Sequence, residues 1–326
     1  MLGAGEVGVR LVAVPHEDDI EPGVQTHPFL GPLVHVPGLV EEGDLDVGHL
    51  PGKLSQRGIA VALGAHSCTV YVTGRSERTG DHALPGTIYE TAEAVTAAGG
   101  KGIAYACDMT DDDQIAALFQ QVKADQGRLD ILVNNAFTLS DDLLETKGFW
   151  EKPLSNLEMW DVGVKSNYVA AWHAARIMAP QKSGLIVAIS GFAGTTYTYG
   201  VVFGTSKTAV GRMARDMAVE LAPHNVASLT MWQGLTLTEK AKDNLAKVGD
   251  KMTKSITQMA GSTVEHPGRV VAALAADPEI MKKSGGEFIT TELAMEYGIT
   301  DVDGTVIPSA RASRGDPIWQ PIGENA

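Results

Sequence analysis

The stretch that decides the fold spans residues 111–136 and reads DDDQIAALFQQVKADQGRLDILVNNA. Its first part predicts a helix over 111–126, because Asp111 is a typical N-cap and apolar residues recur on one face. Its second part, 130–133, predicts a short buried strand. A helix that leads into such a strand is the repeating unit of a sheet covered by helices.

The same alternation continues on both sides of this stretch. Strands are expected at 69–73, 102–107, 184–189 and 226–231, and helices at 87–98, 157–178 and 205–221. This order predicts an α/β fold with a doubly wound, Rossmann-like parallel sheet in a single domain. Such sheets bind ligands beyond the carboxyl ends of their strands, so the loops that follow the strands are expected to surround any active site.

Residues 1–55 differ in composition from the rest, since they hold six of the 15 prolines and four of the nine histidines. Short strands are expected at 11–14 and 33–36, and 44–48 is a candidate first strand of the sheet. The histidines lack the tight spacing of a metal site, so no metal is expected. We divide the chain into an atypical Pro/Gly-rich segment, 1–55, and an α/β domain, 56–326. A shifted start or reading frame is an alternative origin of the first segment.

Composition excludes several classes of partner. A formal net charge of −14 argues against nucleic acid and against an anionic membrane surface. No stretch approaches the roughly 18 apolar residues of a membrane span. Cys68 and Cys107 lie in apolar, strand-like runs, which is typical of buried thiols in a reducing compartment. We therefore expect a cytoplasmic protein with no membrane partner.

The loops after the predicted strands carry motifs in a fixed order: Thr73-Gly74-Arg75, Cys107-Asp108, Asn134-Asn135-Ala136, Lys207, and Gln233-Gly234 followed by Thr238. In order and spacing they resemble the short-chain dehydrogenase/reductase family. The stretches 72–76, 84–88 and 148–151, together with Tyr168, are similar to its SDR family member 1-like branch. The resemblance covers residues 56–326. It implies an NAD(P)-dependent oxidoreductase that acts on a small carbonyl or alcohol substrate and forms a homo-oligomer.

The resemblance also implies a set of catalytic positions, most of which are substituted here. In the family a tyrosine transfers the hydroxyl proton, a lysine four residues later assists it and holds the nicotinamide ribose, a serine orients the carbonyl, and an asparagine supports a water relay. Lys207 keeps the lysine position, but Phe203 replaces the tyrosine and has no O–H. The family's two serines map to Ser190 and Gly191, of which the second is normally catalytic. The asparagine position maps to Asp161.

These substitutions leave three functions open. Tyr197 and Tyr199 are the nearest phenols, but Tyr199 lies eight residues before Lys207 and would need an unusual loop path. Loss of the general acid alone costs about two to four orders of magnitude in rate. We therefore expect an oxidoreductase with impaired catalysis, or alternatively a non-catalytic nucleotide- or partner-binding pseudoenzyme. A third reading is a different reaction that uses Lys207 or Asp161 as a base.

The cofactor positions are partly retained. Arg75 matches the residue that accommodates the 2′-phosphate of NADP, Asp108 the residue near the adenine, and Thr238 the residue that touches the carboxamide. Asn134 belongs to the motif after the fourth strand, where Phe137 replaces the usual glycine. The glycine-rich phosphate loop is missing, because residues 57–60 match the helix beyond it. NADP, or NAD, is the expected cofactor, although the missing loop weakens its site.

Overall fold

The computed structural model describes residues 10–15, 55–78, 86–140, 142, 143, 145, 147–237 and 261–322. A seven-stranded sheet with the order β3-β2-β1-β4-β5-β6-β9 forms the centre of this part of the chain. Its strands are β1 Arg10–Pro15, β2 Cys68–Gly74, β3 Lys101–Ala106, β4 Ile131–Asn134, β5 Gly184–Gly191, β6 Val226–Gln233 and β9 Glu287–Ile289. The short strands β7 Leu235–Thr236 and β8 Gly261–Ser262 pair separately.

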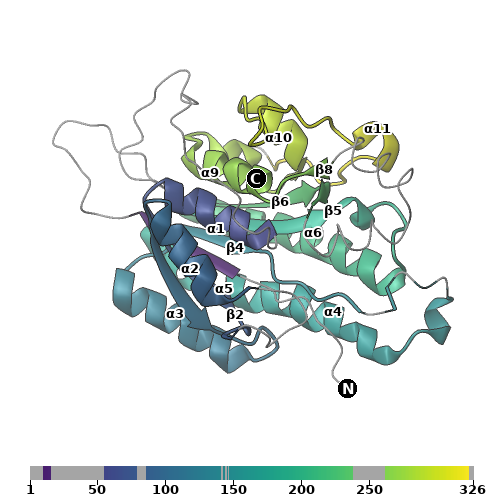
Figure 1. Cartoon of the computed structure of the whole chain (residues 1–326), viewed down its shortest axis with the longest axis horizontal. Coiled ribbons are helices and arrows are strands. Elements are labelled where there is room, and N and C mark those ends of the chain that lie inside the picture. The colour runs from purple at the N-terminus through teal and green to yellow at the C-terminus, as the bar shows by residue number, and fades with distance from the viewer. Residues whose placement is uncertain are drawn as a thin grey trace.

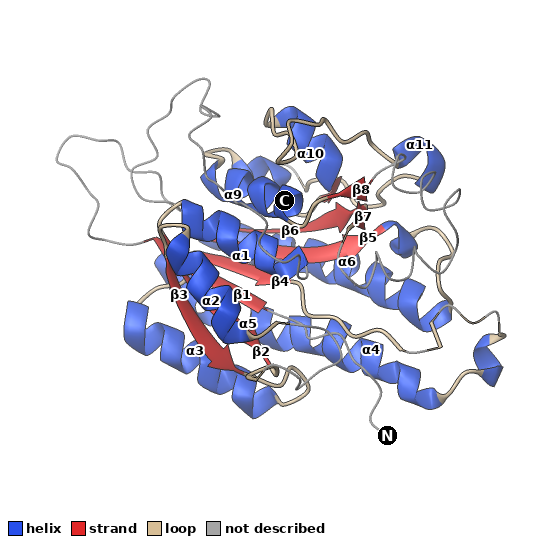
Figure 2. Ribbon diagram, in the orientation of Figure 1, coloured by secondary structure: helices blue, strands red, loops and turns tan. Residues whose placement is uncertain are grey.

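Helices cover both faces of the sheet (Figures 1 and 2). One face carries α1 Ser55–Ala65, α2 Ile88–Ala97 and α9 Glu265–Ala276, and the other carries α3 Asp112–Gln126, α5 Ser166–Gln181 and α6 Val201–Leu221. The shorter helices are α4 Glu158–Trp160, α10 Thr290–Glu296 and α11 Arg311–Arg314.

Two buried clusters show that the sheet is packed on both sides. In β4, Ile131 and Val133 belong to the cluster under α1, α2 and α9. Leu132, between them, belongs to the cluster under α3, α5 and α6. Because side chains alternate along a strand, a sheet with two apolar faces reads as a continuous apolar run. The predicted doubly wound α/β fold is confirmed.

The predicted helix starts and stops follow from local chemistry. Asp111 accepts hydrogen bonds from the backbone of the first turn of α3, as expected of an N-cap. Thr87 and Glu90 form a capping box at the start of α2. Asn225 adopts a left-handed conformation, with φ 54°, before β6 begins. The helix expected at 157–178 instead consists of α4, a π-helical turn at Asp161–Lys165, and α5.

The central strand β1 departs from the predicted topology. The strand expected at 11–14 exists, but it lies between β2 and β4 and is antiparallel to both. The other six strands are parallel to one another. The expectation of a wholly parallel sheet is therefore wrong at β1. The candidate first strand at 44–48 lies outside the described residues, and β1 occupies the position between β2 and β4. The strand expected at 33–36 lies outside the described residues.

The reversed direction of β1 places its end away from the edge where a ligand is expected. Pro15, the last residue of β1, pairs with Cys68 at the start of β2, so β1 ends at the edge opposite the carboxyl ends of the parallel strands. Helix α1 nevertheless begins at the edge formed by the carboxyl ends of the parallel strands. Only two residues separate the end of α1 from the start of β2, which lies at the opposite edge. Gly58 in its first turn has no room for a side chain, because a Cβ there would lie 1.8 Å from the Val264 carbonyl oxygen.

Both cysteines are buried free thiols, as the sequence predicts. Burial, and secondarily the charge of Asp130, raises the pKa of Cys68 to about 12. The thiol of Cys68 is therefore protonated at neutral pH and acts as a small apolar side chain.

Candidate active site

Helix α6 places Phe203 and Lys207 on one face, one turn apart. The Lys207 ammonium nitrogen lies 3.8 Å from the ring centre of Phe137 and 5.7 Å from that of Phe203. The two phenylalanine rings meet edge to face, with centres 5.5 Å apart. The sequence predicts that Phe203 and Lys207 lie together, but it gives no sign that Phe137 completes the group.

Both nearby tyrosines lie on the loop that precedes α6. The Tyr199 ring packs edge to face against Phe203, with ring centres 5.3 Å apart. The backbone of Tyr199 has a positive φ of 60°. Tyr197 is 82% exposed. Tyr199 therefore adds a ring beside Phe203, on the loop that precedes α6.

Ser190 and Gly191 end β5 beside α6. The buried Ser190 hydroxyl donates a hydrogen bond of 3.1 Å to the Lys207 carbonyl oxygen, so it anchors the helix. Gly191 has extended backbone, and a Cβ built there would meet the Gln233 carbonyl oxygen at 3.5 Å, an ordinary contact. A serine side chain therefore has room to start at position 191.

The remaining catalytic position, Asp161, is exposed at the start of the π-helical turn. Inward from it, Gly163 faces Phe137, since a Cβ at Gly163 would lie 2.4 Å from the phenylalanine ring. The sequence pattern does not single out Asn167. Its side-chain amide donates to the Gly163 carbonyl at 2.8 Å, and its backbone carbonyl accepts from the Asn134 side chain at 3.1 Å. The only sequence signal for it was a polar residue within an otherwise buried helix face.

The expected cofactor residues lie along the carboxyl edge of the sheet. Arg75 after β2 and Asp108 after β3 form an ion pair at 3.7 Å, and each is about one-third exposed. Asn134 ends β4 and is buried. Thr238 lies outside the described residues. No three potential metal ligands cluster in the described ranges.

Several buried polar atoms at this edge lack a hydrogen-bond partner within the described part of the chain. They are the Ser76 hydroxyl, the Asn135 amide nitrogen, the Ser140 hydroxyl and the Gln233 amide nitrogen. These residues follow β2 and β4 or end β6. Buried polar groups are normally paired, so unpaired ones on neighbouring loops fit a polar ligand such as a nucleotide.

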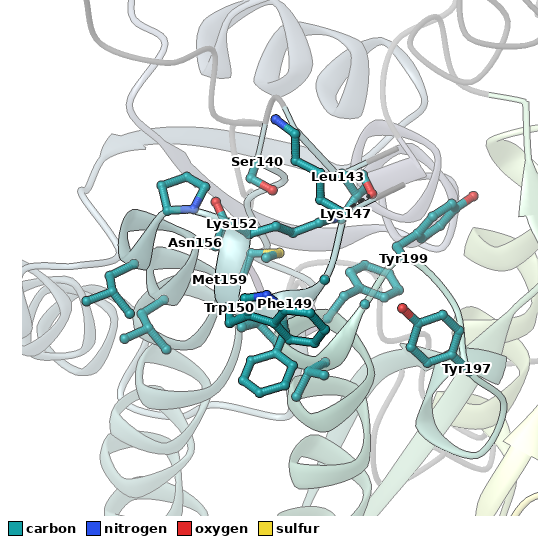
Figure 3. A pocket seen from close by; sticks show the side chains of 18 residues that line it. Ser140, Leu143, Lys147, Phe149, Trp150, Lys152, Asn156, Met159, Tyr197 and Tyr199 are labelled. Atoms are coloured by element: carbon teal, nitrogen blue, oxygen red, sulfur yellow. Dashed lines mark hydrogen bonds between the residues drawn. The ribbon is translucent and has the colours of Figure 1, made fainter. Parts of the chain in front are cut away.

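A cavity of about 420 Å³ adjoins Phe203 (Figure 3). Its wall is largely apolar and aromatic and includes Phe149, Trp150, Tyr197 and Tyr199. Lys152, which also lines it, donates to the Asp142 carbonyl oxygen at 3.1 Å. Lys147 at the rim pairs with Glu145 at 2.6 Å. Both lysines are therefore occupied by the loop itself, and the cavity suits a neutral apolar ligand.

The C-terminal stretch 301–322 extends to the loop after β5. The Thr196 hydroxyl donates to the Arg314 carbonyl oxygen, and Arg311 binds the Glu292 carboxylate of α10. Among the described helices, none has both the length and the apolar character that a membrane span requires.

Comparison with known proteins identifies what this arrangement is similar to. The sequence profile described as short chain dehydrogenase matches residues 57–249. Dehydrogenase/reductase SDR family member 1 of Homo sapiens is 38% identical over 260 residues, which cover 76% of this chain and 80% of that protein. The Mus musculus counterpart is 37% identical over the same shares. The crystal structure of a putative dehydrogenase from Xanthomonas campestris has the same fold, with a TM-score of 0.64, 23% identity, and coverage of 81% and 92% of the two chains.

Proposed function

Because the chain belongs to the short-chain dehydrogenase family, we propose that it binds an NADP nucleotide but reduces carbonyl substrates only slowly. One observation carries this proposal: Phe203, one turn before Lys207, has an aromatic ring and no proton to donate. An oxidoreductase fold and a nucleotide site belong to the family as a whole. The slow turnover is specific to this chain.

The chemistry explains why this substitution matters. A bound reduced nicotinamide supplies hydride, and hydride addition to a carbonyl leaves an alkoxide that must be protonated. Phe203 cannot protonate it, and Gly191 offers no hydroxyl to polarise the carbonyl. Ser190 donates its hydroxyl proton to the Lys207 carbonyl. The groups that stabilise developing charge are therefore missing where the family needs them.

The choice of NADP rests on Arg75. Its guanidinium stands immediately after β2 and is about one-third exposed, and Asp108 lies 3.7 Å away rather than in close bidentate contact. A guanidinium at this position is suited to bind a 2′-phosphate. The first turn of α1 supplies backbone N–H groups at the same edge.

The cavity beside Phe203 supports a class of substrate. Its aromatic wall and its loop-bound lysines favour a neutral, apolar carbonyl compound or alcohol over a charged one. Aromatic rings such as Trp150 and Phe149 offer large apolar contact areas to a ligand of this kind.

The proposal is tested by restoring the missing groups together. We expect Gly191→Ser with Phe203→Tyr to raise NADPH-dependent reduction of an apolar ketone by about 100-fold or more. The matched control is Gly191→Ser with Phe203→Leu, which restores the serine hydroxyl but no acid, and its rate should stay well below that of the restored variant. A wild-type rate equal to or above that of the restored variant would overturn the proposal.

The second candidate function is a pseudoenzyme that binds a nucleotide or a partner without turnover, and it is supported by the combined loss of the phenol at Phe203 and the hydroxyl at Gly191. A homo-oligomer is part of either proposal, since Tyr168 and Trp172 on α5 are 55% and 45% exposed. The buried free thiols suit a reducing compartment such as the cytoplasm.

A further inference from the structure

We propose that Phe137 is a positioning residue for Lys207, and that its ring binds the lysine ammonium in a site where Phe203 stands in place of the family's tyrosine. This inference rests on the proposed function, because it concerns the same site. Phe137 lies outside the set of catalytic positions.

The contact geometry is that of a cation–π interaction. The Lys207 nitrogen lies 3.8 Å from the Phe137 ring centre, well inside the roughly 6 Å limit of such contacts. Its distance to the Phe203 ring centre is 5.7 Å, near that limit. The Phe137 ring is only 9% exposed, and a desolvated ring binds a cation more strongly than an exposed one. Of the two rings, Phe137 therefore makes the stronger contact with Lys207.

Neighbouring residues fix the ring at this place. Gly163 leaves the space that the ring fills, because a Cβ there would lie 2.4 Å from Phe137 Cδ2. Asn167 holds the Gly163 carbonyl with a hydrogen bond of 2.8 Å. Phe203 meets the ring edge to face from the other side. The ring thus has support from the π-helical turn, α5 and α6, and its position is set independently of Lys207.

The position of the ammonium has a consequence for turnover. A lysine held over Phe137 is directed toward the apolar cluster of Phe137, Leu143 and Met159. Removal of the ring in a chain that already carries Gly191→Ser and Phe203→Tyr should release the ammonium to assist the new phenol. We expect Phe137→Gly in that background to raise kcat about tenfold further, with a smaller change in KM for the ketone.

A direct test detects the ring contact without any turnover. Lysine labelled with 13C at Cε is incorporated into the full chain, and the Lys207 signal is identified by its loss in Lys207→Met. Ring current should displace its Hε protons upfield in the wild type. Phe137→Leu should abolish that displacement, whereas Phe137→Trp should keep it and Phe203→Leu should change it less.

A second variant keeps the test decisive if Phe137→Leu misfolds. Gly163→Ala leaves both contact partners intact but displaces the ring, and it should also remove the upfield shift. An unchanged Lys207 signal in a folded Phe137→Leu or Gly163→Ala chain would overturn the role of Phe137. If the restored background shows no turnover, the proposed function fails, while the Lys207 signal still decides the role of Phe137.

Discussion

At the scale of single residues, His266 is an unusual group. It lies in the first turn of α9, is 1% exposed, and neither ring nitrogen has a hydrogen-bond partner within the described ranges. A buried polar group without a partner costs free energy, and a charged one costs more. Burial accordingly lowers the pKa of His266 from its ordinary value of 6.5, although the charge of Asp301 opposes the shift.

This lowered pKa predicts a loss of stability on the acid side of neutrality. The unfolded chain takes up a proton at His266 near pH 6.5, whereas the folded chain resists it to lower pH. The contribution of His266 to stability is therefore present above about pH 6.5 and is lost as the pH falls below that value. His266→Phe should reduce the drop in the urea midpoint between about pH 7.5 and about pH 5.5.

His224→Phe, at an exposed position, provides the control for the replacement of a histidine by phenylalanine. His66 and His173 also have lowered pKa values, so part of the drop should persist in His266→Phe. Identical pH profiles for the wild type and His266→Phe would contradict this account.

At the residue scale, the sequence predicted which side chains of the catalytic positions lie together. Motif spacing alone predicted that Phe203 and Lys207 would lie together, since residues four apart share a helix face. Phe137 could be recognised only as a replacement for glycine. Its contact with Lys207 depends on how α6 packs against the loop after β4, which the local sequence pattern does not encode.

At the scale of secondary-structure elements, helix α6 is fitted closely to the C-terminal stretch. A Cβ at Gly211 would lie 1.9 Å from the Glu287 carboxylate oxygen Oε1. That buried carboxylate accepts hydrogen bonds from the Ile318 and Trp319 backbone, and Trp319 also packs near Gly211. Burial raises the pKa of Glu287 even though these donors oppose the shift. Gly211 therefore leaves space for Glu287, whose carboxylate binds the backbone of Ile318 and Trp319 in the C-terminal stretch.

Gly211→Ala should consequently destabilise the protein. At an unconstrained helix position this change stabilises by roughly 0.5–1 kcal/mol, because glycine loses more entropy on folding. Here overpacking against Glu287 should reverse the sign and cost about 1–3 kcal/mol in the free energy of unfolding measured in urea. Val219→Ala, at a half-exposed position of the same helix, should be nearly neutral. A stabilising Gly211→Ala would show that the tail does not pack against α6 in this way.

The sequence predicted elements where periodicity and capping agree, as in α3, but the prediction over 157–178 was wrong in part. A continuous helix was expected there, whereas a π-helical turn interrupts it. The residues of that turn, such as Val162 and Val164, are apolar in an ordinary helical pattern. Gly163 within this turn packs against Phe137, a contact between segments 26 residues apart that the local pattern does not encode.

At the scale of the whole molecule, the direction of β1 is the main departure from expectation. A short apolar run closed by Pro15 predicted a strand at 11–14, but such a run has the same pattern in either direction, so its antiparallel orientation could not be predicted. Because β1 runs against its neighbours, its last residue, Pro15, lies at the edge opposite the carboxyl ends of the parallel strands.

Hydrogen exchange tests this topology. If β1 is the central strand between β2 and β4, the amides of residues 10–15 should exchange slowly, as core strands do. Val12→Pro should disrupt the strand strongly, because a proline within a central strand removes a ladder hydrogen bond. Mass spectrometry of peptides from residues 10–15 and 68–74 would measure both effects. Fast exchange over 10–15 in the wild type would contradict a central position for β1.

Calorimetric titration of the full chain with NADPH, and separately with NADH, decides whether a nucleotide site is retained beside Phe203, a residue that cannot donate a proton. We expect binding of NADPH with a Kd of about micromolar order, weaker binding of NADH, and loss of this preference in Arg75→Ala. Absence of heat with either nucleotide would overturn the proposed function and leave only the fold of a dehydrogenase.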